Sequence, residues 1–343
     1  IYVADAGDTG WSRLCLRQSD LVCLLADANK EPGKRGWEKN LLGSQGSTTA
    51  RRALLLRHPA TDAPITGTRD WIKHRDLEFH LHLRKDHPGD VGRFVRILLG
   101  EAVGLVLGGG AARGFAEIGA YRALYEAGVP IDWVGGTSIG AIIGAAVAQD
   151  RDPDYVTEES REAFVKGKPF GDFTLPILSL LRGRRMERLT QHHLKGEIED
   201  LPIPFFCVST FLDSGELQVH QQGSIWRSLR ASAALPGMLP PAVVNRRLVV
   251  DGAVLNNLPV DIMCEMPVGR VIAVDVSSRR LYTVEYDELP SPWSVLRSRL
   301  IPGKRIRVPG VISVLMKSAE IGTAAKMREI SERADLLLRP PVH

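Results

Sequence analysis

Short apolar runs alternate with polar stretches along the whole chain of 343 residues. Apolar runs of about four to eight residues bounded by turn-forming residues are typical of buried strands. They predict strands over residues 1–4, 21–26, 53–56, 103–107, 132–135, 205–209, 216–220, 247–250, 271–276 and 335–338. Helical spacing follows two of these strands, over 116–127, where Gly128 can end the helix, and over 139–148. Repetition of strand, turn and helix in this order predicts an α/β protein with a mostly parallel central sheet flanked by helices.

The same pattern divides the chain into parts. Residues 1–100 are expected to form an N-terminal α/β flanking segment, in which 29–49 is rich in glycine, lysine and serine and predicts a loop. Residues 101–278 contain both strand-turn-helix repeats and the later strands, which makes them the main domain. Residues 279–343, with helical spacing over 311–333, are expected to form a helical segment that packs on the main domain.

Composition narrows the class of protein. A hydrophobic content of 44% suits a globular chain, and the formal net charge of +4 arises from 44 basic and 40 acidic residues that are interspersed. This balance lacks the basic field of nucleic-acid-binding proteins, so nucleic acid is not an expected partner. The four cysteines have no CxxC spacing, which argues against a zinc site or a disulfide framework and favours reduced thiols in the cytoplasm.

The start of the chain bears on targeting. It lacks the basic and then apolar order of a signal peptide, and no stretch reaches the roughly 18 apolar residues that a membrane-spanning helix needs. The chain begins at Ile1 rather than Met and opens on an apolar run. We therefore expect it to be part of a longer protein.

A serine stands in a sharp turn between a predicted strand and a predicted helix. Gly136-Thr137-Ser138-Ile139-Gly140 has the GxSxG pattern of a nucleophile elbow. The flanking glycines tolerate the strained turn that exposes the Ser138 hydroxyl, and the start of the helix favours negative charge beside it. The pattern alone also fits a structural turn in which the serine caps the helix.

A glycine-rich turn, Gly108–Gly114, precedes this serine by one strand-helix unit. Its backbone N–H groups are therefore expected at the same end of the sheet as Ser138, where an oxyanion hole belongs. Arg113 can hold this loop or contact a phosphate. A nucleotide-binding loop fits less well, because each GxGxxG register meets Arg113 or Ala111 at a glycine position and no Gly-Lys-Ser/Thr follows.

Asp251 is the candidate base for Ser138. It follows an apolar run and precedes Gly252, so its carboxylate can enter a cleft on a tight turn, although an ordinary Asp-Gly turn has the same sequence. A carboxylate could take a serine proton only where burial raises its pKa. The other candidate bases are the histidines between the two motifs, His192, His193 and His220. His220 lies in an alternating strand, where capping or packing is expected, and only His343 follows Asp251, so a Ser-Asp-His triad in α/β-hydrolase order is not expected.

Histidines also gather between residues 70 and 96, where His80 and His82 share one face of a predicted strand. Two such imidazoles can begin a metal site, but no third ligand has the required spacing. We expect solvated or hydrogen-bonded surface histidines here, and no metal.

Between residues 175 and 194 an apolar stretch precedes a basic one. Leucine and isoleucine predominate first, followed by Arg182, Arg184, Arg185 and Arg188. This order is typical of an interfacial patch or a lid at a lipid surface. It also fits an ordinary helix that packs its leucines inward.

Together, the glycine turn, the serine turn and Asp251-Gly252-Ala253 resemble the conserved motifs of the patatin-like phospholipases. The resemblance covers 103–276 in detail and includes the runs 132–140, 231–237, 239–241 and 256–259. Two flanking runs, 11–20 and 338–341, are similar to the neuropathy target esterase branch of that family. The resemblance implies a three-layer sandwich related to the α/β-hydrolase fold, with residues 101–278 as the catalytic domain.

The resemblance also implies a role for each matching residue. Ser138 would be the nucleophile, Asp251 its base, and the amides of Gly109 and Gly110 the oxyanion hole. The supporting loop and elbow positions would be Gly108, Arg113, Gly114, Gly136 and Gly140. Ala111 stands where the family's loop often has glycine, so a positive φ there would be strained.

The implied reaction is hydrolysis of lysophospholipid or phospholipid acyl esters through an acyl-enzyme, with no cofactor. The implied location is cytoplasmic, at a peripheral membrane surface. The cyclic-nucleotide-binding-like domains that the branch usually carries upstream are not found in these residues, as expected for part of a longer chain.

Two other classes of function fit the same sequence. One is a catalytically inactive lipid- or nucleotide-binding regulatory module that retains the fold. The other is a thioesterase, a protease or a general carboxylesterase, because GxSxG does not select among acyl donors.

Overall fold

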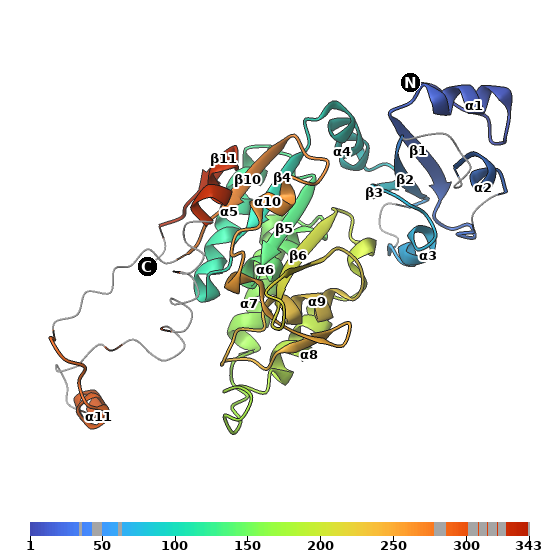
Figure 1. The fold of residues 1–343 in the computed structure, drawn as a ribbon. Helices are drawn as coiled ribbons and strands as arrows, with labels where there is room; N and C mark the ends of the chain where they lie inside the picture. The colour runs from blue at the N-terminus through green and yellow to red at the C-terminus, as the bar shows by residue number, and fades with distance from the viewer. Residues whose placement is uncertain are drawn as a thin grey trace.

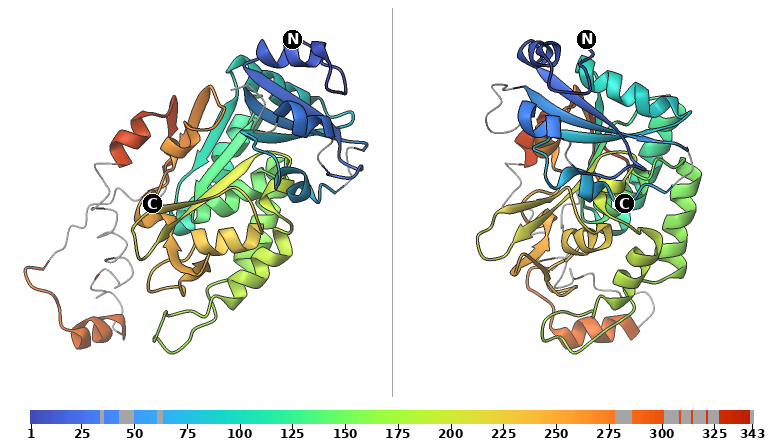
Figure 2. Two further views of the ribbon diagram at one scale, coloured as in Figure 1. Left: turned by 45° about the vertical axis from the view of Figure 1, so that its right-hand side comes forward. Right: turned by 90° about the vertical axis from the view of Figure 1, so that its right-hand side faces the viewer.

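The computed structural model describes residues 1–33, 36–42, 50–60, 64–277, 286–300, 308, 314, 321 and 327–341. Within these residues the chain forms a small N-terminal sheet and a larger central sheet (Figure 1). Figure 2 shows the N-terminal layer at one end of the molecule and the connection between α7 and α8 at the other.

The N-terminal layer is a parallel sheet in the order β1-β2-β3. Its strands are β1 (Leu21–Asp27), β2 (Arg51–His58) and β3 (Phe79–Arg84), and its helices are α1 (Gly10–Arg17), α2 (Gly36–Leu42), α3 (Thr68–Ile72) and α4 (Pro88–Leu99). Helix α4 carries the chain into the central sheet. A proline begins it, and Gly100, with a φ of +68°, ends it, which is the usual placement of these two residues.

The central sheet has the order β11-β10-β4-β5-β6-β9-β8, with β7 paired to β6. Its strands are β4 (Val103–Leu107), β5 (Trp133–Thr137), β6 (Phe205–Phe211), β7 (Leu217–His220), β8 (Ala242–Val244), β9 (Arg247–Asp251), β10 (Arg270–Val274) and β11 (Leu336–Leu338). The strands from β11 to β6 run parallel, and β7, β9 and β8 add antiparallel pairs. The prediction of a mostly parallel central sheet is confirmed.

Helices cover both faces of this sheet and complete the three layers. One core packs α5 (Phe115–Glu126), α6 (Ile139–Val147), α8 (Arg184–His193) and α9 (Ile225–Ser232) against one face. The second core packs α4, α10 (Val260–Met263) and β3 against the other face. Two further α-helices are α7 (Pro153–Arg161) and α11 (Pro292–Leu300). Because both faces are covered, β4 and β5 are buried at every position, which explains their uninterrupted runs of apolar and small residues.

Several predicted elements differ in the structure. Residues 1–4 form no strand, because an apolar run needs a partner strand to bond its backbone and these residues pair with none among the described ones. The loop predicted over 29–49 contains α2. Most of the residues in the helix predicted over 311–333 lie outside the part of the chain that the structure describes. Residues 327–332 of this range are described and are helical. The separate limits of the main domain and of 279–343 stay a prediction.

The two sheets meet at a junction of histidines, of which His58 and His82 are buried and His80 is half-buried. His80 and His82 of β3 both bond through Nε2 to the backbone oxygen of Glu199, each at 2.9 Å, and His58 Nε2 lies 3.0 Å from His82 Nδ1. The short helix η3 (Ile198–Asp200) presents this oxygen and covers the histidine face of the strand. The expectation of surface histidines is therefore wrong for His82, whose exposed fraction is 2%.

An ionic cluster lies beside the histidine junction. His87, Asp90 and Asp150 are the metal-ligand types that the described residues bring together. The Arg84 guanidinium binds both carboxylates, that of Asp90 at 2.7 Å through Oδ1 and that of Asp150. The cluster is thus an ion-pair network between β3 and the main domain.

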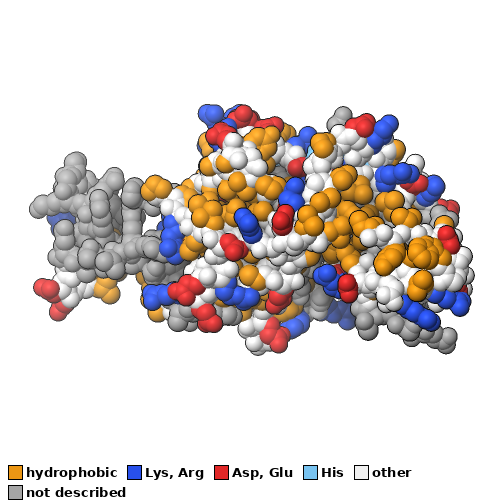
Figure 3. All heavy atoms as spheres, turned by 90° about the horizontal axis from the view of Figure 1, so that it is seen from above, with side chains coloured by type: hydrophobic (Ala, Val, Ile, Leu, Met, Phe, Trp, Pro, Cys, Tyr) orange, Lys and Arg blue, Asp and Glu red, His pale blue; other side chains and the backbone are white. Residues whose placement is uncertain are grey.

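The surface above the N-terminal layer is partly apolar. Figure 3 shows apolar side chains over this end of the molecule, and those on α4 include Val91, Val95, Leu98 and Leu99.

In the part of the chain that the structure describes, no helix combines the length and apolarity needed to cross a membrane.

Candidate active site

Ser138 stands at the turn between β5 and α6 in a strained conformation. Its φ of +57° and ψ of −121° lie outside the regions that L-residues favour. Close packing of two glycines makes this turn possible. A Cβ on Gly136 would lie 2.7 Å from the Gly140 backbone, and a Cβ on Gly140 would lie 2.4 Å from the oxygen of Leu107 in β4. The elbow glycines predicted from the sequence therefore bring the serine turn against the end of β4.

Asp251 reaches Ser138 across β6. It ends β9 opposite Ser209 of β6, and its Oδ2 accepts a 2.7 Å hydrogen bond from Ser138 Oγ. Its Oδ1 accepts a 2.9 Å bond from the N–H of Ala253 in the short helix η4 (Gly252–Val254). The carboxyl is fully buried, and this burial raises the pKa of Asp251 to about 6, against the opposing effect of both hydrogen bonds. Asp251 is thus a stronger base than a solvated aspartate.

The end of α9 supports both members of this pair. The Ser138 N–H donates to Ser232 Oγ at 3.0 Å, and the Asp251 N–H donates to the oxygen of Ala234 at 3.0 Å. Sequence reasoning assigned no role to Ser232 or Ala234. Both lie in the run 231–237 that resembles the family. This resemblance is the sequence signal that could have identified them.

The glycine loop lies against Ser138 and is held by Asn257. The Gly109 N–H donates to the Asn257 backbone oxygen at 3.0 Å, and the Gly109 oxygen accepts from Asn257 Nδ2 at 2.9 Å. A Cβ on Gly109 would lie 3.4 Å from Ser138 Cβ. The Gly109 amide is thus bonded to Asn257 in this structure, and its role in an oxyanion hole stays a prediction. The Gly110 N–H donates no hydrogen bond within the described residues.

The rest of the loop is compact. Ala111 adopts a φ of +51° at the start of η1 (Ala111–Gly114), which is the strained conformation foreseen for an alanine here. Arg113 is half-buried, and its Nε has no partner among the described residues. A Cβ on Gly114 would lie 2.4 Å from Ile139, so this glycine lets the loop pack on α6. Gly108 bonds through its N–H to β10 at 3.1 Å.

The histidines between the two motifs lie elsewhere. His220 Nε2 is 2.8 Å from Ser209 Oγ, and burial lowers the pKa of His220 to about 4. His193 Nδ1 lies 2.6 Å from a carboxylate oxygen of Glu159, and the His192 ring lies edge-on to that of His193. The structure places the Asp251 carboxylate, and none of these three histidines, in hydrogen-bonding contact with Ser138 Oγ.

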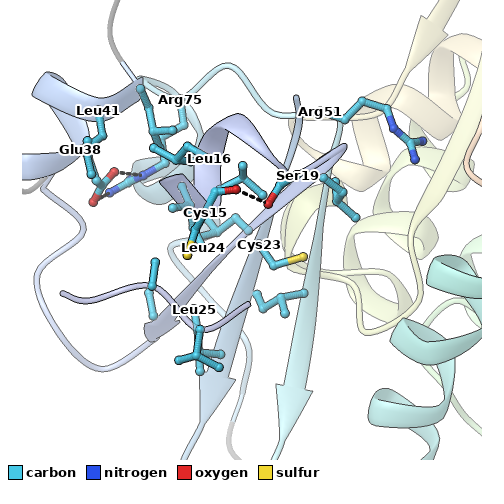
Figure 4. A pocket seen from close by; sticks show the side chains of 18 of the residues that line it. Cys15, Leu16, Ser19, Cys23, Leu24, Leu25, Glu38, Leu41, Arg51 and Arg75 are labelled. Carbon is cyan, nitrogen blue, oxygen red and sulfur yellow. Dashed lines mark hydrogen bonds and ion pairs between the residues drawn. The ribbon is translucent and has the colours of Figure 1, made fainter. Parts of the chain in front are cut away.

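A cavity of about 1240 Å³ lies in the N-terminal layer (Figure 4). Among the residues that line it are Cys15, Cys23, Leu25 and the ion pair of Arg75 with Glu38. Neither Ser138 nor Asp251 lines this cavity. The serine-aspartate contact, rather than cavity size, identifies the candidate active site.

Two family models match the chain. Residues 105–263 match the patatin-like phospholipase model, and residues 1–100 match the neuropathy target esterase family P-loop like domain. The chain thus contains a patatin-like phospholipase domain and, before it, a neuropathy target esterase family P-loop like domain. The predicted resemblance to the patatin-like phospholipases and to their neuropathy target esterase branch is confirmed.

Relatives in animals and fungi match the whole chain. Patatin-like phospholipase domain-containing protein 6 from Homo sapiens is 34% identical over 100% of this chain and 27% of its own length. Lysophospholipase NTE1 from Mycosarcoma maydis and neuropathy target esterase sws from Drosophila melanogaster are each 31% identical over 100% of this chain, and the matches cover 21% and 26% of those proteins. The chain thus spans about a quarter of the length of these relatives. The crystal structure of VipD from Legionella pneumophila aligns with 54% of this chain and 51% of that chain, at a TM-score of 0.35 and 16% identity.

Proposed function

We propose that this chain hydrolyses acyl esters of lysophospholipids or phospholipids, with Ser138 as the nucleophile and Asp251 as its base. The observation that carries the proposal is the 2.7 Å hydrogen bond from Ser138 Oγ to the buried carboxylate of Asp251. The family of the chain supports the substrate class, and so do relatives named as a phospholipase domain-containing protein and as a lysophospholipase.

In the first step Asp251 takes the Ser138 proton as Oγ attacks the acyl carbonyl carbon. The carbonyl π electrons move to its oxygen, and backbone N–H groups stabilise the resulting oxyanion. We assign one of these donors to Gly110, whose N–H has no acceptor within the described residues. The ester C–O bond then breaks, the alcohol oxygen takes the proton from Asp251, and the acyl group stays on Ser138.

In the second step Asp251 takes a proton from water while the water oxygen attacks the acyl carbon. The bond to Ser138 Oγ breaks, the serine recovers its proton from Asp251, and the fatty acid leaves. No step requires a metal or an organic cofactor. We assign the phosphate of the lipid headgroup to the Arg113 guanidinium, whose Nε has no hydrogen-bond partner among the described residues.

Replacement of the serine tests this proposal. Ser138→Ala should lower turnover of lysophosphatidylcholine and of p-nitrophenyl esters by more than about a thousandfold and abolish labelling by a fluorophosphonate probe. Ser160→Ala, at a buried serine of α7, is the control and should leave both readouts unchanged. Activity retained by Ser138→Ala would contradict the assignment.

A substrate panel separates lipid hydrolysis from other acyl transfers. Lysophosphatidylcholine and diacylphosphatidylcholine should be cleaved with higher kcat/KM than an acyl-CoA of the same chain length. Preference for the acyl-CoA would favour a thioesterase. A wild-type chain that neither reacts with the probe nor cleaves any member of the panel would favour an inactive module.

A further inference from the structure

Residues 172–182 form a hairpin with an apolar tip. Phe173 and Leu181 pair across it as an antiparallel bridge, and the Thr174 N–H donates to the oxygen of Leu180 at 3.0 Å. The tip side chains are almost free of contacts, with exposed fractions of 77% for Leu175, 85% for Ile177 and 75% for Leu178. The tip side chains therefore do not pack inward as those of a helix, whereas Leu181 at the base of the hairpin is buried. Helix α8 begins only at Arg184.

Four arginines follow the apolar tip directly. They are exposed and form no ion pair with a carboxylate within the described residues: Arg182, Arg184, Arg185 and Arg188. Unpaired guanidiniums next to exposed aliphatic side chains combine the two attractions that hold a peripheral protein on an anionic bilayer.

The shape of this surface favours a bilayer over a folded partner. The hairpin protrudes from the end of the molecule opposite the N-terminal layer (Figures 1 and 2). A convex apolar tip would require a matching groove in a partner protein, whereas lipid acyl chains rearrange around it. Monomeric soluble proteins rarely leave several neighbouring aliphatic side chains this exposed without a binding role.

The hairpin is bonded to the segment that supports the dyad. The backbone N–H groups of Leu180 and Leu181 donate to the oxygens of Gly237 and Met238, both at 2.9 Å. Three residues before Gly237, Ala234 accepts the bond from the Asp251 N–H. The apolar tip and the candidate active site therefore share one stretch of backbone.

We propose that hairpin 172–182, together with the arginines that follow it, docks the chain on an anionic lipid bilayer beside Ser138. Leu175, Ile177 and Leu178 enter the acyl region, and the guanidiniums bind lipid phosphates. The role of this docking rests on the proposed function, because docking here delivers membrane lipids to Ser138 and Asp251. The docking itself does not depend on catalysis and can be measured separately.

Vesicle binding tests the docking surface. The probe is a vesicle of phosphatidylcholine and phosphatidylserine, and binding is measured by flotation in the Ser138→Ala background, so that hydrolysis cannot alter the lipid. Replacing the tip with I177D/L178D should lower partitioning at least tenfold, and reversing charge with R182E/R184E/R185E should do the same. The matched control, Val91→Asp, places one carboxylate on an exposed apolar residue of α4 at the other end of the molecule and should bind like the parent.

Activity measurements complete the test. In the active chain, I177D/L178D should hydrolyse a water-soluble p-nitrophenyl ester at the wild-type rate, which also shows that the site is folded, and should lose at least tenfold in hydrolysis of vesicle lipid. Unchanged vesicle partitioning of both hairpin variants would overturn the docking proposal. Equal binding to vesicles of phosphatidylcholine alone would overturn the part assigned to the arginines. Failure of the wild-type chain to cleave any ester would overturn the proposed function and leave the binding result standing.

Discussion

At the scale of the residue, removal of water from one carboxylate sets the chemistry of the site. The Asp251 carboxylate is fully buried and, among the residues that the structure describes, accepts two hydrogen bonds, from Ser138 and from Ala253. Burial raises the pKa of Asp251 to about 6. A base with this pKa is largely ionised at neutral pH and still accepts a proton more readily than an ordinary aspartate.

Activity should therefore depend on pH through Asp251. Because the base must be ionised, kcat/KM for a soluble ester should fall about tenfold for each pH unit below an apparent pKa near 6 and level off above it. A pH–rate profile between about pH 4.5 and 8 measures this limb. A profile that stays flat through pH 6 would show that Asp251 is not the titrating base.

A second buried carboxyl, that of Glu117, affects the stability of the fold. Glu117 in the first turn of α5 is fully buried, and neither of its oxygens has a hydrogen-bond partner among the described residues. Burial raises its pKa well above the ordinary value for glutamate, against the opposing effect of the nearby Gly108 backbone, so the folded chain holds this proton more tightly than the unfolded chain does. Raising the pH above the pKa that this glutamate has in the unfolded chain therefore lowers the free energy of unfolding.

Glu117→Gln should remove this loss because its side chain does not ionise. The variant should exceed the wild type in free energy of unfolding by about 1 kcal/mol or more near pH 8, and the difference should vanish near pH 4.5. Urea unfolding at both pH values measures it. Glu126→Gln, at an exposed position of the same helix, should change stability at neither pH.

At the scale of the element, the active site depends on segments that hold one another. Asn257 binds the glycine loop through both its backbone and its side chain, and Thr137 of β5 donates to the oxygen of Asn256 at 3.0 Å. The turn after η4 thus fixes the loop and the serine elbow together. Loss of one bond in this arrangement should loosen the loop without removing a reacting group.

Asn257→Ala should lower kcat on a soluble ester about tenfold, which corresponds to the loss of one hydrogen bond of about 1.4 kcal/mol, and should leave KM nearly unchanged. Steady-state kinetics separate the two constants. The control is Asn40→Ala on the exposed side of α2, where wild-type kinetics are expected. An unchanged kcat for Asn257→Ala would show that the loop keeps its geometry without this side chain.

The sequence predicted those parts of the site whose signals are local. The strand before the glycine loop, the serine elbow and the Asp-Gly turn each follow from a few adjacent residues, and chain order suggested that they meet. The acceptor for the Gly109 amide is 148 residues away, and the neighbour of the His82 ring is 117 residues away. Such contacts depend on how whole elements pack, which local periodicity does not encode. The apolar and basic order of 175–194 was visible, but only the hairpin geometry showed which side chains face solvent.

At the scale of the whole molecule, buried charge connects the N-terminal layer to the main domain. Asp132, the residue before β5, accepts bonds of 2.8 and 2.6 Å from Arg96 of α4 and a bond of 3.0 Å from the N–H of Val103, which begins β4. The Asp132 side chain is fully buried, whereas that of Arg96 is 28% exposed. Removing the buried partner of such a pair leaves the other charge uncompensated.

Asp132→Asn should therefore lower the free energy of unfolding by about 3 kcal/mol, as measured by urea denaturation. Asp154→Asn makes the same change in the exposed pair with Arg122, where the Asp154 side chain is 86% exposed. This control should cost less than about 1 kcal/mol. Equal losses in the two variants would show that the buried pair has no special weight in joining α4 to the sheet.

The histidine junction has a consequence for where its hydrogen atoms lie. The Glu199 backbone oxygen can only accept, so His80 and His82 must both carry hydrogen on Nε2. Burial keeps the pKa of His82 low, so this ring is neutral, its Nδ1 is bare, and His58 must donate to it from Nε2. The Glu199 backbone oxygen thus determines the tautomers of His80 and His82 directly and, through His82, that of His58. Added acid would place hydrogen on both facing nitrogens of His58 and His82, which would remove the hydrogen bond between these side chains of β2 and β3.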